Sequence, residues 1–268
     1  MSCPSAEYFD RWSRQHFAAL EADAATFVAR AAPAAGHEAA ATRSVVVRIA
    51  GLGLEKGDDA SGALLRERLA IEPDPGVAHQ IVTVAARSQQ RPVARAIVAA
   101  GLAHSDLAVR ETACLLIQQG EDTAALDALD AALDAPTTTP TLFQYCFQSL
   151  ANAWTSRSPP SRGAYDRTLR RLETGPRDAS HPIFPVVFEL TTLPPGGDLV
   201  DPARIDRLVR DIAKDARASP AARSAALTSL MGKDPALLKE VGLTLEEAQA
   251  IIKDGIRETA AQPKPPAR

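Results

Sequence analysis

Two stretches of this chain carry the same apolar pattern about 32 residues apart, and this spacing constrains the fold more than any single motif. Val77 and Val109 hold equivalent places after short turn-forming segments, and Val82, Cys114 and Cys146 form a second column at the same offset. A period of this length is typical of helical hairpins. Stacked hairpins form an α-solenoid, which presents a long curved surface and has no chemistry by default.

The composition favours helices. Alanine makes up roughly a fifth of the 268 residues. Most of the twenty prolines precede or begin an expected helix, where proline costs no backbone hydrogen bond. The length allows two compact domains or one elongated array, and the repetition favours the array. We predict an all-α fold, an α-α superhelix of about six helical hairpins.

Helix start and stop signals divide the chain into pairs. We expect a first helix from Ser5 to Arg30 and a second over 36–50, although the valines at 45–47 also suit a short strand. The following pairs are expected at 60–71 with 75–88, 91–103 with 106–119, 123–134 with 140–154, 164–173 with 182–190, and 202–216 with 220–231. The last helix should run from Thr244 to Thr259.

Three of the expected helices have recognisable capping residues. Asp74 and Ser105 are the expected N-caps of the helices that begin near Pro75 and Asp106. Thr244 and Glu247 have the spacing of a capping box. The segment 184–192 is harder to assign, because it contains strand-favouring residues.

These elements predict a single domain over residues 1–258. Its expected parts are an N-terminal capping hairpin at 5–51, regular repeats at 60–154, less regular repeats at 164–231 and a C-terminal cap at 234–258. A disordered tail is expected at 259–268. Aromatic residues are crowded into the first helix, which suits a terminal cap or, alternatively, a docking face.

The segment 92–118 is similar to a HEAT repeat. In such repeats a Val-Arg pair opens the second helix, as Val109 and Arg110 do here. The segment 219–227 looks like the same helix opening, and Val77 keeps the valine without the arginine. The resemblance implies a HEAT-like α-solenoid over 60–232 with an interaction role.

The chain also departs from that pattern. The family often has an aspartate six residues before the arginine, where this chain has His104 and Arg217. HEAT-like proteins include scaffolds, assembly chaperones, bilin lyases and some DNA glycosylases. The resemblance therefore implies a fold without naming a partner.

No motif predicts a catalytic, cofactor or metal site. The glycine-containing segment 51–57 fails the dinucleotide fingerprint, because Lys56 takes the place of the third glycine. The histidines are scattered, and no His-Glu-x-x-His or Cys-x-x-Cys is present. We therefore expect no enzyme, no cofactor and no metal. The alternative is an enzyme on the same scaffold, either a lyase or a DNA glycosylase. A DNA glycosylase would need a basic groove, whereas the second helices here also carry the acids Glu111 and Glu189.

Charge and termini limit the partners and the location. The net charge is −3 with dispersed basic residues, which argues against nucleic acid as the partner. The excess of arginine over lysine indicates a GC-rich bacterial coding sequence. No segment has the length of apolar residues that crosses a bilayer, so we expect a cytoplasmic protein. The alternative is an envelope lipoprotein anchored through Cys3.

The cysteine count does not predict a disulfide framework. Three cysteines are present, an odd number. Cys114 and Cys146 are expected on neighbouring helices at equivalent depth, where they could form a bridge or remain small buried thiols.

We expect a protein partner to bind the second helices of the hairpins, because these usually line the concave side of a solenoid. One helix stands out, since it combines amide and aromatic side chains that suit peptide recognition. The sequence leaves the identity of the partner and the oligomeric state open. The candidate residues are Gln80, Arg87, Glu111, Gln118, Gln144, Tyr145, Gln148, Asn152 and Trp154.

Overall fold

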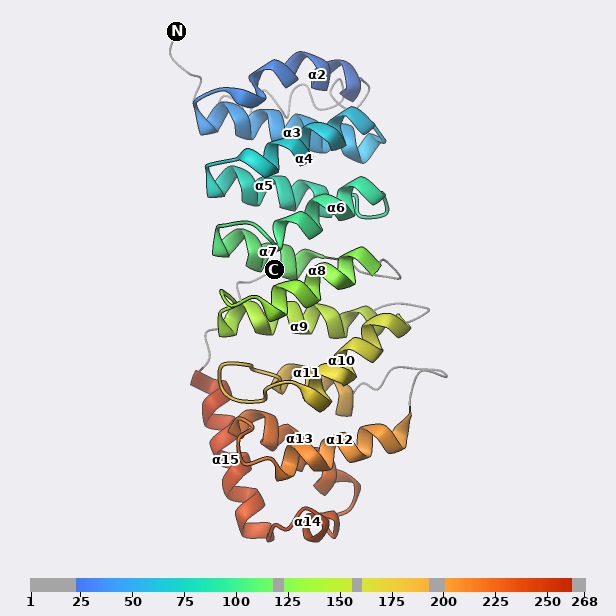
Figure 1. Ribbon diagram of the computed structural model, residues 1–268, viewed down its shortest axis with the longest axis vertical. Helices are drawn as coiled ribbons and strands as arrows, with labels where there is room; N and C mark the ends of the chain where they lie inside the picture. Colours follow the sequence, from blue (N-terminus) through green and yellow to red (C-terminus); the bar gives the residue numbers. More distant parts are fainter. Residues whose placement is uncertain (1–22, 118–122, 156–160, 193–200, 262–268) are drawn as a thin grey trace. The chain divides into compact units, whose positions relative to one another are not determined.

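The computed structural model describes residues 23–117, 123–155, 161–192 and 201–261 (Figure 1). Every regular element in these ranges is a helix, so the all-α class is confirmed for them. The chain divides into two compact units, Met1–Ile117 and Gln118–Arg268, and we describe each by itself. The single-domain organisation and the repeat count stay predictions. None of the described helices is long and apolar enough to cross a bilayer.

Unit 1 consists of helices that pack in two layers. The second helices α3, α5 and α7 pack side by side, and the first helices α2, α4 and α6 form the other layer (Figure 1). Close approach in this unit depends on Gly101, because an added Cβ would lie 2.8 Å from Val82 and 3.0 Å from Ala113. The elements are α2 (Ala24–Ala31), the 3-10 helix η1 (Ala32–Gly36), α3 (Ala40–Lys56), α4 (Asp59–Ile71), α5 (Pro75–Ala86), α6 (Pro92–Gly101) and α7 (Leu107–Leu116).

Unit 2 also contains a succession of packed helices. Here α9, α11 and α13 are the second helices, α11 packs against both α9 and α13, and α15 packs against α13. Gly255 of α15 sits so close to α13 that an added Cβ would lie 2.5 Å from the Pro220 carbonyl oxygen. The elements are α8 (Thr123–Asp134), α9 (Pro140–Thr155), α10 (Arg162–Thr174), α11 (Phe184–Thr192), α12 (Pro202–Lys214), α13 (Pro220–Lys233), α14 (Leu237–Glu240) and α15 (Leu245–Ala261).

Short polar side chains cap most of the second helices and α15. Each accepts a hydrogen bond from the backbone N–H three residues further on, which satisfies a donor that has no partner inside the helix. The pairs are Asp74 with Val77 at 3.0 Å, Asp106 with Val109 at 3.1 Å, Thr139 with Leu142 at 3.2 Å, Ser219 with Ala222 at 3.2 Å and Thr244 with Glu247 at 3.2 Å. Asp74 and the Thr244–Glu247 capping box are confirmed. Ser105 is not the cap of α7, because Asp106 is.

Two expected boundaries near the N-terminus are wrong. The helix expected from Ser5 to Arg30 is not continuous, because α2 begins at Ala24 after Asp23, whose backbone is not helical and whose carboxylate caps α2. The second helix does not end near Gly51 and Gly53. It continues to Gly57 at φ +97°, because the two glycines let α3 pack against Val84 and Ser61 where a Cβ would clash.

Other boundaries differ by smaller amounts. The segment 184–192 is helical rather than strand-like, and so is 45–47 within α3. The helix α10 begins at Arg162, because Ser161 caps it. The last helix continues to Ala261, so 259–261 are helical rather than part of a tail. The remainder of the expected tail, 262–268, and residues 1–22 lie outside the described residues.

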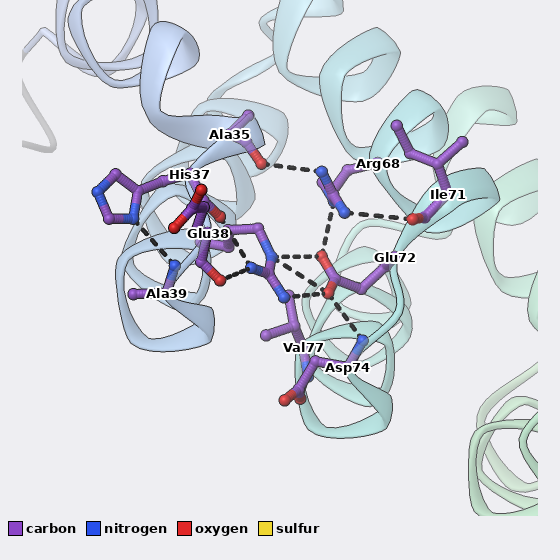
Figure 2. A network of polar contacts seen from close by, with 10 residues as sticks. Ala35, His37, Glu38, Ala39, Arg68, Ile71, Glu72, Asp74 and Val77 are labelled. Atoms are coloured by element: carbon purple, nitrogen blue, oxygen red, sulfur yellow. Dashed lines mark hydrogen bonds and ion pairs between the residues drawn. The ribbon is translucent and has the colours of Figure 1, made fainter.

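A buried carboxylate joins the hairpins of unit 1. The Glu72 side chain is fully buried and accepts hydrogen bonds from Arg43 at 2.7 Å and 3.0 Å, from Arg68 at 2.6 Å and from the Asp74 backbone N–H at 2.9 Å (Figure 2). Burial by itself raises the pKa of Glu72, but the hydrogen bonds from Arg43 and Asp74 and the charges of both arginines hold it below its ordinary value.

Both arginines extend this network to backbone carbonyls. Arg43 donates to the carbonyl oxygens of His37 at 2.8 Å and Glu38 at 2.6 Å, and Arg68 donates to that of Ala35 at 3.1 Å. The network therefore ties η1 and the start of α3 to the end of α4 and the turn before α5 (Figure 2).

We expect Glu72→Gln to lower the free energy of unfolding by about 3 kcal/mol near neutral pH, because the change leaves the buried Arg43 and the half-buried Arg68 without their counter-ion. A carboxylate with a lowered folded-state pKa stabilises the fold above its unfolded-state pKa and loses this effect as pH falls through the folded-state value. The difference in unfolding free energy between wild type and variant should therefore become smaller when the pH is well below 4.5, the ordinary pKa of glutamate. Urea unfolding near neutral pH and at a pH well below 4.5 measures this difference. The control is Glu67→Gln, which changes an exposed residue on α4. A pH-independent difference would contradict it.

Candidate functional site

The candidate residues of unit 1 lie on α5 and α7 or just after α5. Gln80 of α5 accepts a hydrogen bond from the Ser44 hydroxyl of α3 at 2.6 Å, so it joins two second helices. Arg87 is exposed, and its guanidinium lies 3.9 Å from the Glu55 carboxylate. Glu111 is half-buried on α7, and burial raises its pKa. No hydrogen bond or ion pair within the described ranges joins these three side chains.

The candidates of α9 form one face of that helix. Gln144, Tyr145, Gln148 and Asn152 recur at helical spacing and are all half-buried. The side-chain amides of Gln144 and Gln148 make no hydrogen bond within the described part of the chain. Gln118 and the Trp154 side chain lie outside the described residues.

The opposite side of α9 belongs to the core. Phe143, Cys146, Phe147 and Leu150 are buried there, as their spacing predicts. Cys114 of unit 1 is also fully buried, within α7. The amides of α9 therefore lie on the half-buried side of the helix, away from this core.

The neighbouring second helix adds two residues that sequence reasoning did not select. Phe188 of α11 is 50% exposed, although its ring lies 6.1 Å from that of Phe184. Glu189 follows it and is half-buried. Because α11 packs against α9, we define the α9–α11 face as Gln144, Tyr145, Gln148, Asn152, Phe188 and Glu189.

Glu189 is electrostatically unusual. One of its carboxylate oxygens is buried and has no hydrogen-bond partner among the described residues. Desolvation by burial raises the pKa of Glu189, and no charged group in the described ranges offsets the effect. An ionised carboxylate in this position favours a donor or cation from outside the described chain.

A cavity of about 350 Å³ lies elsewhere in unit 2, and we call it the loop cavity. Residues 133–136 and Thr138 from the end of α8 and the following turn line one side. The other sides are lined by Phe143 of α9, Arg171 of α10, and Pro176, Ser180 and His181 of the α10–α11 connection.

Ion pairs between α8 and α10 lead into this cavity. Asp127, Asp130 and Asp134 recur along α8 and alternate with Arg167 and Arg171 of α10, and we call this set the ion-pair row. Its last member, Asp134, is held by Arg171 through two hydrogen bonds of 2.8 and 2.9 Å. The carboxylate of Asp134 nevertheless remains 70% exposed.

His181 closes another side of the loop cavity. Its ring lies edge-on to Phe143, with centroids 5.1 Å apart, and its Nδ1 lies 3.0 Å from a carboxylate oxygen of Asp178. The hydrogen bond with His181 holds the pKa of Asp178 below its ordinary value. The residues of this cavity come from separate turns, so no spacing in the sequence identifies them.

Comparison with protein-family models, curated proteins and solved structures gave no match for this chain. We therefore infer its function from its own contacts.

We expect Glu189→Gln to raise the free energy of unfolding near neutral pH by about 0.5–1 kcal/mol, because a half-buried, unpartnered carboxylate costs stability that solvent partly screens. Because the folded-state pKa is raised, the loss of stability is complete when the pH is above that pKa. It vanishes when the pH falls below the ordinary value of 4.5, where the carboxylate is protonated in both states. Urea unfolding against pH measures the effect.

The matched control for this prediction is Asp211→Asn, a change at an exposed acid on α12. Surface changes of this kind stay within about 0.5 kcal/mol. A Glu189→Gln variant less stable than wild type near neutral pH would show that Glu189 has a partner in the free protein.

Proposed function

We propose that this chain is a non-enzymatic, HEAT-like α-solenoid module that binds a protein partner on the α9–α11 face. Two-layer packing within each unit supports the architecture, because α3, α5 and α7 pack in succession, as do α9, α11 and α13. Recurring caps before the second helices support it as well.

The observation that carries the binding proposal is that two consecutive residues of α11, Phe188 and Glu189, both have unsatisfied surface. One is an acid with a buried, unpartnered oxygen, and the other is an aromatic side chain that is half exposed to solvent. Both features raise the free energy of the unbound protein. A bound partner can supply a hydrogen-bond donor to the carboxylate and cover the aromatic ring.

The chemistry of the face indicates what the partner presents. A basic side chain would complement Glu189, an apolar side chain would cover Phe188, and backbone amides would pair with Gln144 and Gln148 of α9. A polypeptide offers all three, whereas the phosphates of a nucleic acid would be repelled by the carboxylate.

Affinity purification from the native host tests this proposal when it is run with variants of the face. We expect at least one protein to be captured by wild type and by the control Asp211→Lys, and to be lost with Glu189→Lys and reduced with Phe188→Ala. The control reverses the charge of an exposed acid on the other layer. Identical capture by all four baits, or recovery of a small molecule or nucleic acid without a specific protein, would contradict the proposal.

A further inference from the structure

The loop cavity has the shape of a binding site for a small group. Its volume is about 350 Å³, and Leu133, Pro136, Phe143 and Pro176 supply apolar walls beside Asp134. Pockets that combine apolar walls with a few polar groups are the usual form of small-ligand sites. Apolar walls next to a carboxylate suit a ligand with a hydrocarbon stem and a polar end.

The charged side chains that line this cavity are Asp134 and Arg171, which pair with each other, and acids outnumber arginines in the ion-pair row beside it. In the ion-pair row, three carboxylates oppose two guanidiniums, which leaves one net negative charge. Asp178, which lies beside His181 and does not itself line the cavity, adds a fourth carboxylate. The cavity also adjoins the C-terminal end of α8, where helical carbonyl groups concentrate partial negative charge.

Arg171 does not reverse this balance, because its donors are committed. It uses four of its five N–H groups on Asp134, on the Asp130 carboxylate and on the Asp130 carbonyl oxygen. An anionic ligand would have to displace one of these acids. Asp134, in contrast, is 70% exposed and can accept further hydrogen bonds on its outer side.

We propose that the loop cavity binds an alkyl-guanidinium or alkyl-ammonium group, with Asp134 as its anion and Phe143 and the proline rings against its stem. Arginine and lysine side chains carry these groups, and so do free diamines. The proposal does not depend on the α9–α11 face, because the two sites share no residue.

Isothermal titration of the full chain with four probes tests this assignment. Two are cations, Nα-acetyl-arginine methylamide and agmatine. Two are controls, the neutral isostere Nα-acetyl-citrulline methylamide and the anionic Nα-acetyl-glutamate methylamide. We expect saturable binding of the cations and none of the controls. Tighter binding of the arginine derivative would indicate a side chain of a polypeptide as the natural ligand, and tighter binding of agmatine would indicate a free amine.

The ion-pair row offers a matched pair of variants. Asp134→Asn and Asp127→Asn each remove an exposed outer carboxylate that pairs with an arginine, but only Asp134 lines the cavity. We expect cation binding to weaken about tenfold or more in Asp134→Asn and to persist in Asp127→Asn. Ser180→Trp, which fills the cavity without a change of charge, should also abolish binding. Thermal unfolding of each variant checks its folding.

Three outcomes would overturn the proposal. They are the absence of saturable cation binding to wild type, equal loss of binding in Asp127→Asn and Asp134→Asn, and preferential binding of the anionic or neutral probe. The face variants Glu189→Lys and Phe188→Ala should leave cation binding unchanged, so failure here and failure of the proposed function are distinguishable.

Discussion

The place where each second helix begins is the constraint on which the rest of this structure depends. The first backbone N–H groups of a helix have no partner within it, and a capping oxygen fixes which residue starts the helix. A shift of one residue would rotate the helix by about 100°. Asp74 and Asp106 therefore determine that Val77 and Val109 point into the core, where each is almost fully buried.

Packing in two layers buries one side of a second helix in the core and leaves another side less buried. On α9 and α11 this side carries amides, an exposed phenylalanine and Glu189, one of whose oxygens is buried and has no hydrogen-bond partner among the described residues. The buried Glu72 of unit 1 shows the contrast, because there two arginines and a backbone N–H satisfy the carboxylate. A carboxylate that the fold satisfies stabilises the fold, whereas the cost of the unsatisfied Glu189 oxygen is the basis of the binding that we propose.

Much of the fold could be predicted, because it follows from local signals. The 32-residue offset, the prolines at helix starts and the cap at Asp74 depend on residues close together in the chain. The predicted end of α3 was wrong because of tertiary packing. Gly51 and Gly53 remain helical, and their lack of a Cβ lets other helices approach. The α9 side of the candidate face could be predicted from spacing. The buried oxygen of Glu189 and the loop cavity could not be predicted, because both depend on how the helices and turns pack together.

The central claim is that a protein partner binds the α9–α11 face, and amide hydrogen exchange of the full chain with and without that partner tests it most directly. The account predicts slower exchange in peptides that cover 140–155 and 184–192, with little change in 123–134 and 162–174 of the other layer. Protection confined to the other layer, or to unit 1, would contradict it.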